Sequence, residues 1–395
     1  MTAEIVKGFQ DYSEEQALKR AEIKKIIQEQ FELYGFMPCE TPIIEYEDFV
    51  KQGNENSEDE AVSDIFKLQD KGKRKLALRY EFTFQLKRLA ENKKLPFKRY
   101  QIGEVFRDEP TGKNRFKQFS QCDADIVGSS VKDEAEILAL TSSILNRLGI
   151  KFTININNRK FLNEILQEQK IKEKDKQAII REIDKLDKLP EKEVRKNLRK
   201  YKAEKILNIF KKSESFFKKF ESYKEIEELK KYCRLYNVQV KFQPSLARGL
   251  SYYNGNVFEI KTENKNIKET IAAGGSYSVN KIPATGISFG LERLSELAKI
   301  KLENKSVLII SIAQDKKSIK LAENLRKQNL RTELWTEKGI SKALDYANSK
   351  KIPFVIFLGK EEIKKGKIKL RNMKTGREKF LKEKGFTRIL KTKGL

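Results

Sequence analysis

The chain has 395 residues, enough for two or three domains at roughly 150 residues each. Lysine and arginine number 83 against 57 aspartate and glutamate, so the formal net charge is +26, which indicates a polyanionic partner. The sequence contains no histidine, which excludes the commonest general base, the commonest metal ligand and every Ser-His or Cys-His catalytic pair. Its chemistry must therefore use carboxylates, arginine, lysine, tyrosine and the backbone.

The cysteines and the apolar runs indicate a cytoplasmic protein. Cys39, Cys122 and Cys233 lie far apart and form no C-x-x-C pair, so neither a disulfide framework nor a thiolate zinc site is expected. The first residues lack the charged start and apolar block of an export signal. The longest apolar runs, such as 307–312 and 354–358, fall far short of the ~20 residues that cross a membrane. We expect a soluble protein in a reducing compartment, with no membrane partner.

The first predicted element is a helix. Residues 13–16 read Ser-Glu-Glu-Gln, a capping box, and apolar residues then recur on one helical face from Ile23 to Tyr34, with Gly35 as the stop. Strands are predicted next, in pairs that suggest an antiparallel sheet. They cover residues 65–68 and 76–80, joined by a turn at 70–73, and then 97–107 and 118–127.

The composition changes at about residue 159. From there to about residue 235 the sequence is dense in lysine and glutamate and has one proline and no glycine, which predicts a basic helical insertion. Strand-like, turn-rich sequence returns from residue 238 to about 296, and residues 302–305 look like a linker.

The last part of the chain alternates strand and helix patterns. Ile340, Ala343, Leu344 and Ala347 give the i, i+3, i+4, i+7 stripe of a helix. This order predicts a small β-α-β-α-β unit with parallel pairing. The strands are expected at 307–312, 330–335 and 354–359, and the helices at 316–328 and 339–350.

Polar residues mark one face of the strand predicted at 118–127. Alternation places Phe119, Gln121, Asp123 and Asp125 on that face. The face is either exposed to solvent or part of a polar site. The second interpretation is favoured by Arg107 and the basic loop that follows it, because a guanidinium group can bind a phosphate through two charge-assisted hydrogen bonds.

Five segments, in order along nearly the whole chain, resemble the motifs of histidyl-tRNA synthetases. Residues 34–42 are similar to motif 1 of the class II synthetases, 106–125 to motif 2 and 286–294 to motif 3. The Arg-Gly-Leu-x-Tyr-Tyr element at 248–253 is particular to the histidyl family, and residues 78–83 add a further match. The residues of these motifs look more similar to those of archaeal-type members than to those of bacterial ones.

The resemblance implies an α+β protein: a class II antiparallel sheet with flanking helices, a helical insertion and a C-terminal α/β anticodon-binding domain. It also implies a homodimer that activates histidine with ATP and Mg²⁺ and transfers the histidyl group to the 3′ end of histidine tRNA. The expected parts are a first catalytic segment at 1–158, the basic insertion at 159–235, a second catalytic segment at 236–301 and the anticodon-binding domain at 306–395.

The family's catalytic and ATP-binding positions fall on charged and aromatic residues. By resemblance, Arg107 meets the α-phosphate, where charge develops during attack by the amino-acid carboxylate, and Arg293 holds the γ-phosphate. Glu109 contacts adenine and Phe119 stacks on it. Arg248 lies near the α-phosphate and the substrate carboxylate, partly in place of a metal, and no protein ligand to a metal is expected.

The family's histidine-binding positions supply donors and acceptors in fixed places. A neutral imidazole needs one of each, and by resemblance Asp125 and Tyr253 provide them, while an α-ammonium group needs acceptors. The matching residues for histidine are Glu81, Thr83, Gln121, Asp125, Arg248, Tyr252, Tyr253 and Tyr277, and those for tRNA are Lys113, Arg115 and Lys117.

Three serines replace residues that are charged in most family members. Ser251 stands where the family has Asp, and Ser276 and Ser278 stand where it has Arg and Asp. Positive and negative side chains are lost together. The site is therefore either still balanced in charge and functional, or it has lost its catalytic activity. The alternative function is therefore a catalytically silent paralogue, either a tRNA-sensing module or the regulatory subunit of ATP phosphoribosyltransferase. That subunit lacks the anticodon-binding domain that residues 306–395 resemble.

Overall fold

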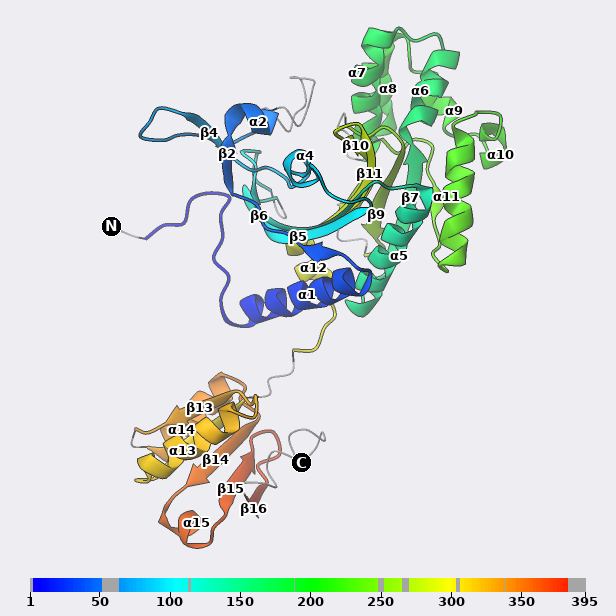
Figure 1. The fold of residues 1–395 in the computed structure, drawn as a ribbon. Coiled ribbons are helices and arrows are strands. Elements are labelled where there is room, and N and C mark those ends of the chain that lie inside the picture. Colours follow the sequence, from blue (N-terminus) through cyan, green and yellow to red (C-terminus); the bar gives the residue numbers. More distant parts are fainter. Residues whose placement is uncertain are drawn as a thin grey trace. The chain divides into compact units, whose positions relative to one another are not determined.

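The computed structural model describes residues 3–51, 64–112, 115–187, 189–247, 252–264, 270–302, 306–337 and 339–382. The chain divides into two compact units, Met1–Ile300 and Lys301–Leu395, which we describe separately. Figure 1 labels their helices and strands.

An eight-stranded sheet forms the centre of the first unit, in the order β1-β5-β6-β11-β10-β9-β7-β8. Its pairs are antiparallel except β1 with β5 and β7 with β8, which are parallel. The antiparallel sheet expected from the sequence is thus confirmed. In chain order the strands are β1 (Met37–Pro38), β5 (Phe97–Phe106), β6 (Gln118–Val127), β7 (Phe152–Asn158), β8 (Lys241–Phe242), β9 (Asn256–Thr262), β10 (Thr270–Val279) and β11 (Ile282–Gly290).

A second, three-stranded sheet contains the predicted hairpin. Strands β3 (Lys67–Gln69) and β4 (Lys75–Leu78) pair antiparallel, and β2 (Ile44–Tyr46) pairs with the other edge of β4. A short helix, α2 (Glu47–Lys51), follows β2.

The predicted first helix is confirmed as α1 (Glu14–Leu33), with Gly35 at φ +79° just beyond its end. The predicted capping box is wrong. Ser13 is the N-cap residue, but its side chain makes no capping hydrogen bond. Glu14 has a φ of +45°, outside the helical range, so the first turn departs from the geometry that the box requires.

The two faces of the large sheet differ. Helices α1, α5 (Val131–Arg147) and α12 (Leu291–Leu297) cover one face (Figure 1). There Cys122, Ala124 and Ile126 of β6 join the main buried cluster. Because side chains alternate along a strand, the polar residues of β6 point to the opposite face, where α4 (Leu86–Leu89) packs near Tyr277.

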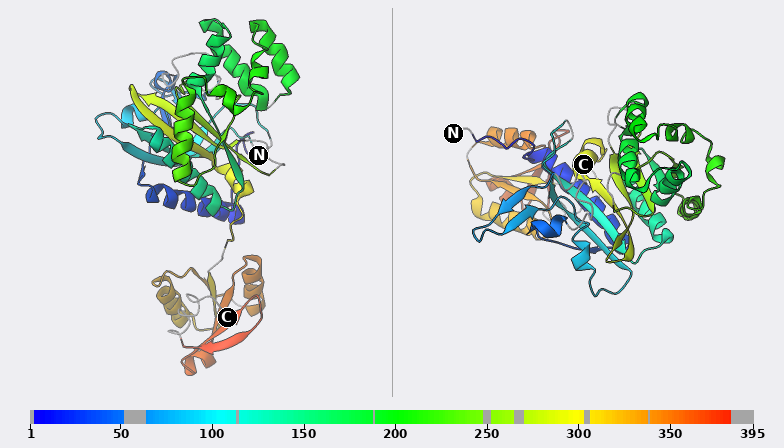
Figure 2. Two further views of the ribbon diagram at one scale, coloured as in Figure 1. Left: turned by 90° about the vertical axis from the view of Figure 1, so that its right-hand side faces the viewer. Right: turned by 90° about the horizontal axis from the view of Figure 1, so that it is seen from above.

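The basic stretch is helical, as predicted, and its helices gather beside β7 and β9 (Figure 1 and Figure 2). Phe161 and Ile226 of this insertion belong to the same buried cluster as Leu138 of α5, so the core continues from the sheet into the insertion. Its elements are α6 (Arg159–Glu168), α7 (Glu173–Asp184), η1 (Lys185–Asp187), α8 (Glu191–Leu198), η2 (Arg199–Tyr201), α9 (Ile206–Ile209), α10 (Glu214–Phe217) and α11 (Tyr223–Leu235).

The second unit is a five-stranded sheet in the order β13-β12-β14-β15-β16. The parallel pairing expected for its first three strands is confirmed, and an antiparallel hairpin around Lys374 and Gly376 extends the sheet. The elements are β12 (Val307–Ser311), α13 (Asp315–Arg326), β13 (Thr332–Trp335), α14 (Ile340–Ser349), β14 (Phe354–Leu358), α15 (Lys360–Lys364), β15 (Ile368–Asn372) and β16 (Glu378–Leu381).

Candidate active site

The polar face of β6 is buried, not exposed to solvent. Gln121, Asp123 and Asp125 are each less than a tenth exposed. Strand β5 adds polar residues directly opposite them, because its register pairs Arg99 with Asp125 and Gln101 with Asp123. The two strands therefore form a floor of buried polar groups on the face that the large helices leave uncovered.

Asp125 lies at the centre of this floor. Its Oδ2 is 2.8 Å from Nη2 of Arg99, which is 1% exposed, and its Oδ1 accepts a hydrogen bond from the Tyr277 hydroxyl. Gly286 of β11 faces Asp125 across the strand pair, and a Cβ atom there would lie 2.1 Å from Oδ1. A residue with a side chain at position 286 would displace the Asp125 carboxylate.

Three tyrosines and one glutamate complete the cluster. The Tyr252 ring centroid is 4.7 Å from that of Tyr253 and 5.7 Å from that of Tyr277. The Tyr252 hydroxyl donates to Oε2 of Glu81 at 3.4 Å. The structure thus brings Glu81, Asp125 and all three tyrosines predicted for histidine binding into one group, in which Tyr252 is half-buried and the others are buried.

Burial sets the electrostatics of these groups. It raises the pKa of Glu81 to about 7 and the pKa of Asp123 to about 8, the latter with a contribution from the neighbouring Asp125 carboxylate. Burial also raises the pKa of Asp125, although the Arg99 guanidinium acts in the opposite direction. The pKa values of Tyr252 and Tyr277 lie well above 10 because burial disfavours their ionised forms, so both hydroxyls are hydrogen-bond donors at neutral pH.

Arg107 follows β5 beside this cluster. Its Nε donates to the carbonyl of Tyr80 at 3.1 Å, and its guanidinium lies 5.1 Å from the centre of the Phe119 ring. Nη1 is 3.9 Å from Oε1 of Glu109, and Glu109 also pairs with Arg115. The predicted ATP-binding residues Arg107, Glu109 and Phe119 therefore lie together, with the predicted tRNA contact Arg115 next to them.

The other predicted residues lie outside this cluster, except Gln121, which is part of the floor. The Gln121 amide donates to the Ser288 hydroxyl at 2.5 Å, and Lys117 pairs with Asp108 in the loop between β5 and β6. Thr83 is half-buried just before α4. Arg293 of α12 donates to the carbonyl of Thr270, at the start of β10, at 2.5 Å. Lys113 and Arg248 lie outside the described residues, as does Ser251.

Sequence analysis placed Asp123 on the polar face of its strand without giving it a binding role, and it did not predict Arg99. Arg99 is the partner of Asp125, and the buried carboxyl of Asp123 interacts with Ser288. The available signal was alternation: Arg99 and Gln101 are polar residues two positions apart in a strand of otherwise mixed pattern. Their pairing with Asp125 and Asp123 becomes visible only when the register of the two strands is known.

The described residues contain no group of three or more Cys, Asp or Glu side chains that could hold a metal ion. Nor does the part of the chain that the structure describes include a helix with the length and apolar character needed to cross a membrane.

Comparisons with known proteins give consistent matches. Residues 8–294 match the family model described as histidyl-tRNA synthetase, and residues 306–393 match the model described as anticodon binding domain. Histidine–tRNA ligase 2 of Shouchella clausii (strain KSM-K16) is 35% identical over 414 residues, covering 95% of this chain and 97% of the relative. Histidine–tRNA ligase of Wolinella succinogenes is 34% identical over 427 residues, covering 96% of each. The expected similarity of the motif residues to archaeal-type members stays a prediction.

Solved structures share the fold. The histidyl-tRNA synthetase from Nostoc sp. PCC 7120 aligns with a TM-score of 0.85 and 24% identity, covering 99% of each chain. A structure described as an ATP phosphoribosyltransferase regulatory subunit/histidyl-tRNA synthetase from Bacillus halodurans C aligns with a TM-score of 0.74 and 20% identity, covering 88% of this chain and 96% of the other.

Proposed function

This chain belongs to the histidyl-tRNA synthetase family, and we propose that it converts histidine and ATP to histidyl-adenylate and then transfers the histidyl group to the 3′ end of histidine tRNA. The observation that carries this proposal is the buried cluster of Glu81, Asp125, Tyr252, Tyr253 and Tyr277, with Arg107 beside it. Such a cluster suits a small polar ligand that must be enclosed and distinguished from its analogues.

Adenylate formation needs positioning and charge stabilisation more than a side-chain base. A carboxylate oxygen of histidine attacks the α-phosphorus of ATP, the new O–P bond forms, and the bond to pyrophosphate breaks. We assign Arg107 to the α-phosphate, because its partly exposed guanidinium lies next to Glu81 and over the Phe119 ring. Glu109 and Phe119 would hold adenine. Arg248 and Arg293 keep the phosphate roles implied by the family, as part of the proposal.

Recognition of the imidazole falls to Asp125 and Tyr253. A buried pocket that binds one donor and one acceptor of the ring rejects ligands lacking them, because its own polar groups would be left unpaired. Arg99 supports this role, since its ion pair fixes one oxygen of Asp125. Glu81, Thr83 and Gln121 would accept hydrogen bonds from the α-ammonium group.

ATP is a substrate here, and Mg²⁺ is proposed to arrive with it, bound to the phosphates and not to a protein site. The ion would neutralise phosphate charge, and Arg107 would act on the α-phosphate from the protein side.

The tRNA would be bound by the basic insertion, by the loop that holds Lys113, Arg115 and Lys117, and by the second unit. The insertion exposes lysines on α8, where Lys192 and Lys196 are examples. Contacts of lysine with phosphates are independent of base sequence and position the tRNA. The division into parts at 1–158, 159–235, 236–301 and 306–395 and the cytoplasmic location also remain proposals.

A homodimer is proposed because, within the described residues, the three-stranded sheet has an exposed apolar face. Ile44 and Tyr46 of β2 and Leu68 of β3 are exposed large apolar residues. The register places Leu76 between Tyr46 and Leu68, which makes a continuous apolar row across the sheet. Large exposed apolar patches mark interaction sites, and a second copy is the occupant proposed here.

The test is aminoacylation of purified histidine tRNA with labelled histidine. We expect charging with histidine and none with other amino acids. A catalytically silent paralogue would bind tRNA without charging it. The match of residues 306–393 to an anticodon-binding model argues against the regulatory-subunit alternative, which lacks that domain.

A further inference from the structure

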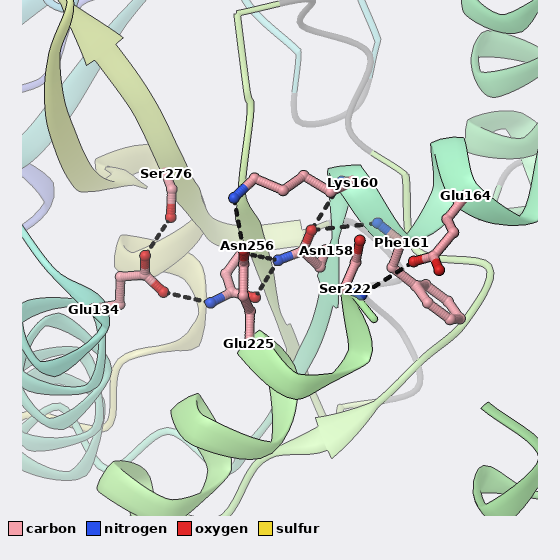
Figure 3. A network of polar contacts seen from close by, with 9 residues as sticks. All are labelled: Glu134, Asn158, Lys160, Phe161, Glu164, Ser222, Glu225, Asn256 and Ser276. Atoms are coloured by element: carbon pink, nitrogen blue, oxygen red, sulfur yellow. Dashed lines mark hydrogen bonds and ion pairs between the residues drawn. The ribbon is translucent and has the colours of Figure 1, made fainter. Parts of the chain in front are cut away.

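Three polar residues lie near the ends of adjacent strands on the helix-covered face of the large sheet. They are Asn158 on β7, Asn256 on β9 and Ser276 on β10, and Glu134 in the first turn of α5 lies against them (Figure 3). Asn158 and Asn256 are register partners. This cluster is separate from the candidate active site, which lies on the other face.

Glu134 is held by hydrogen bonds from two strands. The Ser276 hydroxyl donates to Oε1 at 2.5 Å, and the Asn256 amide donates to Oε2 at 2.7 Å. Glu134 is 6% exposed and Asn256 is 1% exposed. A buried carboxyl with both oxygens bonded fixes the distance between α5 and the two strands, because breaking either bond leaves a buried polar group unpaired.

The network continues into both ends of the insertion. The Asn158 amide donates to Oδ1 of Asn256 at 2.9 Å and to Oε2 of Glu225, on α11, at 2.8 Å. Lys160, in the first turn of α6, pairs with the same carboxylate at 2.6 Å. The first and last helices of the insertion, α6 and α11, are therefore linked through Asn158 and Asn256 to Glu134, the residue that is bonded to β10.

Strand β10 needs such support at Ser276. Gly274 and Gly275 precede it and have no side chains to pack, and Gly275 has a φ of +155°. Pairing of β10 with β9 ends at Gly275, whereas pairing with β11 continues to Val279. The bond from Ser276 to Glu134 therefore fixes β10 just where it leaves β9.

Because side chains alternate, the residue after Ser276 points to the opposite face. That residue is Tyr277, whose hydroxyl donates to Asp125. We propose that Glu134 is a positioning residue for the histidine pocket: through Ser276 it holds β10 in place, so that Tyr277 keeps its contact with Asp125. This inference rests on the proposed function, because that function identifies the pocket.

The electrostatics suit a structural carboxyl. Burial raises the pKa of Glu134 to about 7, and the groups that donate to it, Ser276 and Asn256, are neutral. The charged groups with an electrostatic effect on it are Glu225 and Lys160. A glutamine at position 134 could accept from Asn256 and donate to the Ser276 oxygen, so it would keep both contacts without the charge.

The experiment compares four variants with the wild type in histidine-dependent exchange of pyrophosphate into ATP. Glu134→Ala and Ser276→Ala break the contact, and Glu134→Gln preserves it. Ser278→Ala is the matched control, because Ser278 lies on the same strand and contacts only the exposed Asn254 among the interactions of the described residues. Ser276→Ala also covers the possibility that Glu134→Ala does not fold, since it keeps the bond from Asn256 to Glu134.

We expect the KM for histidine to rise roughly tenfold or more in the two disruptive variants, because a displaced Tyr277 no longer orients the Asp125 carboxylate for its hydrogen bond to the imidazole. The KM for ATP should change by less than about twofold, and the Gln and Ser278 variants should resemble the wild type. Combining Glu134→Ala with Ser276→Ala should add little to the effect of Glu134→Ala alone, because the contact between Ser276 and Glu134 is already lost in that variant. Equal changes in the KM of both substrates would overturn the proposal.

A second measurement separates this inference from the proposed function. Hydrogen exchange of the amides in residues 270–279 should be faster in Glu134→Ala and Ser276→Ala than in the wild type and in Ser278→Ala. If the wild type shows no pyrophosphate exchange, the proposed function fails, and amide protection alone then decides whether Glu134 positions β10. Unchanged protection in both disruptive variants would refute the positioning role.

Discussion

Replacing Asp125 with asparagine tests the assignment of the histidine pocket. The substitution keeps the shape of the side chain but removes its charge and one acceptor. In the structure one oxygen faces Arg99 Nη2 at 2.8 Å and the other accepts from Tyr277. Asparagine keeps one carbonyl oxygen as an acceptor for Arg99 and has an amide that can donate to the Tyr277 hydroxyl, so what is lost is the anionic partner of the Arg99 guanidinium.

The magnitude follows from burial. Arg99 is 1% exposed, so a lost partner leaves an uncompensated charge that solvent cannot reach. Breaking a buried ion pair costs about 3 to 5 kcal/mol, and asparagine, which keeps one acceptor, should fall at or below the lower end of this range. In the proposed pocket, the imidazole also loses its hydrogen bond to the charged Asp125 carboxylate. Such a bond is worth about 1.5 to 3 kcal/mol, which corresponds to a rise of roughly 10- to 150-fold in the KM for histidine.

The assay is histidine-dependent pyrophosphate exchange, with the free energy of unfolding measured in urea to establish that the variant is folded. Asp70→Asn serves as the matched control, because Asp70 is half-buried and pairs with Arg74 in the hairpin of the small sheet, away from the candidate site. We expect the KM for ATP to change by less than about twofold. If the KM values for histidine and ATP rise together, or if neither changes, Asp125 does not contact histidine and the pocket assignment is wrong.

Four further predictions follow from the site, the network, the insertion and the composition. Arg107→Lys should lower kcat of exchange by about 100- to 1,000-fold with little change in stability, because a fixed donor at developing charge is lost; an unchanged kcat would refute its role. Burial raises the pKa of Glu134 to about 7, so the folded state binds more protons than the unfolded state between about pH 5 and 7, and stability falls as pH rises through that range. Urea titrations should therefore show that the free energy of unfolding of Glu134→Gln falls less than that of the wild type between pH 5 and 7, by on the order of 3 kcal/mol. An equal fall in both proteins would contradict this account. Replacing Lys192 and Lys196 with glutamine should reduce the slope of log tRNA affinity against log salt concentration by about 2. Replacing Lys224, which pairs with a neighbouring glutamate, should have less effect. If the slope of the double variant equals that of the wild type, these lysines do not contact tRNA. A message without histidine codons should keep being translated during histidine starvation, measured by pulse labelling, and adding exposed histidines should abolish that advantage; if both versions decline together, the composition is accidental.

Local patterns predicted most of the secondary structure. The apolar stripe of α1, the paired strands β5 and β6 and the alternation of the second unit each depend on residues close in sequence, and each is confirmed. The hairpin β3–β4 was predicted for the same reason. The capping box at Ser13 failed although its sequence is suitable, because the backbone at Glu14 is not helical.

Contacts between distant segments could not be predicted in the same way. The pair Arg99 and Asp125 requires the register of β5 and β6, which alternation alone does not determine. Asn158 and Asn256 lie 98 positions apart and meet only because β7 and β9 pair across the insertion. Acidic residues are common in the first turn of a helix, so nothing local marks Glu134 in the sequence, and its burial depends on the order of three strands.

Pyrophosphate exchange by the wild-type protein tests the central claim most directly. Purified protein is incubated with ATP, Mg²⁺ and labelled pyrophosphate, together with each standard amino acid in turn. We predict label in ATP with histidine and with no other amino acid. Binding of ATP and histidine without exchange, or exchange with a different amino acid, would contradict the claim that this chain activates histidine.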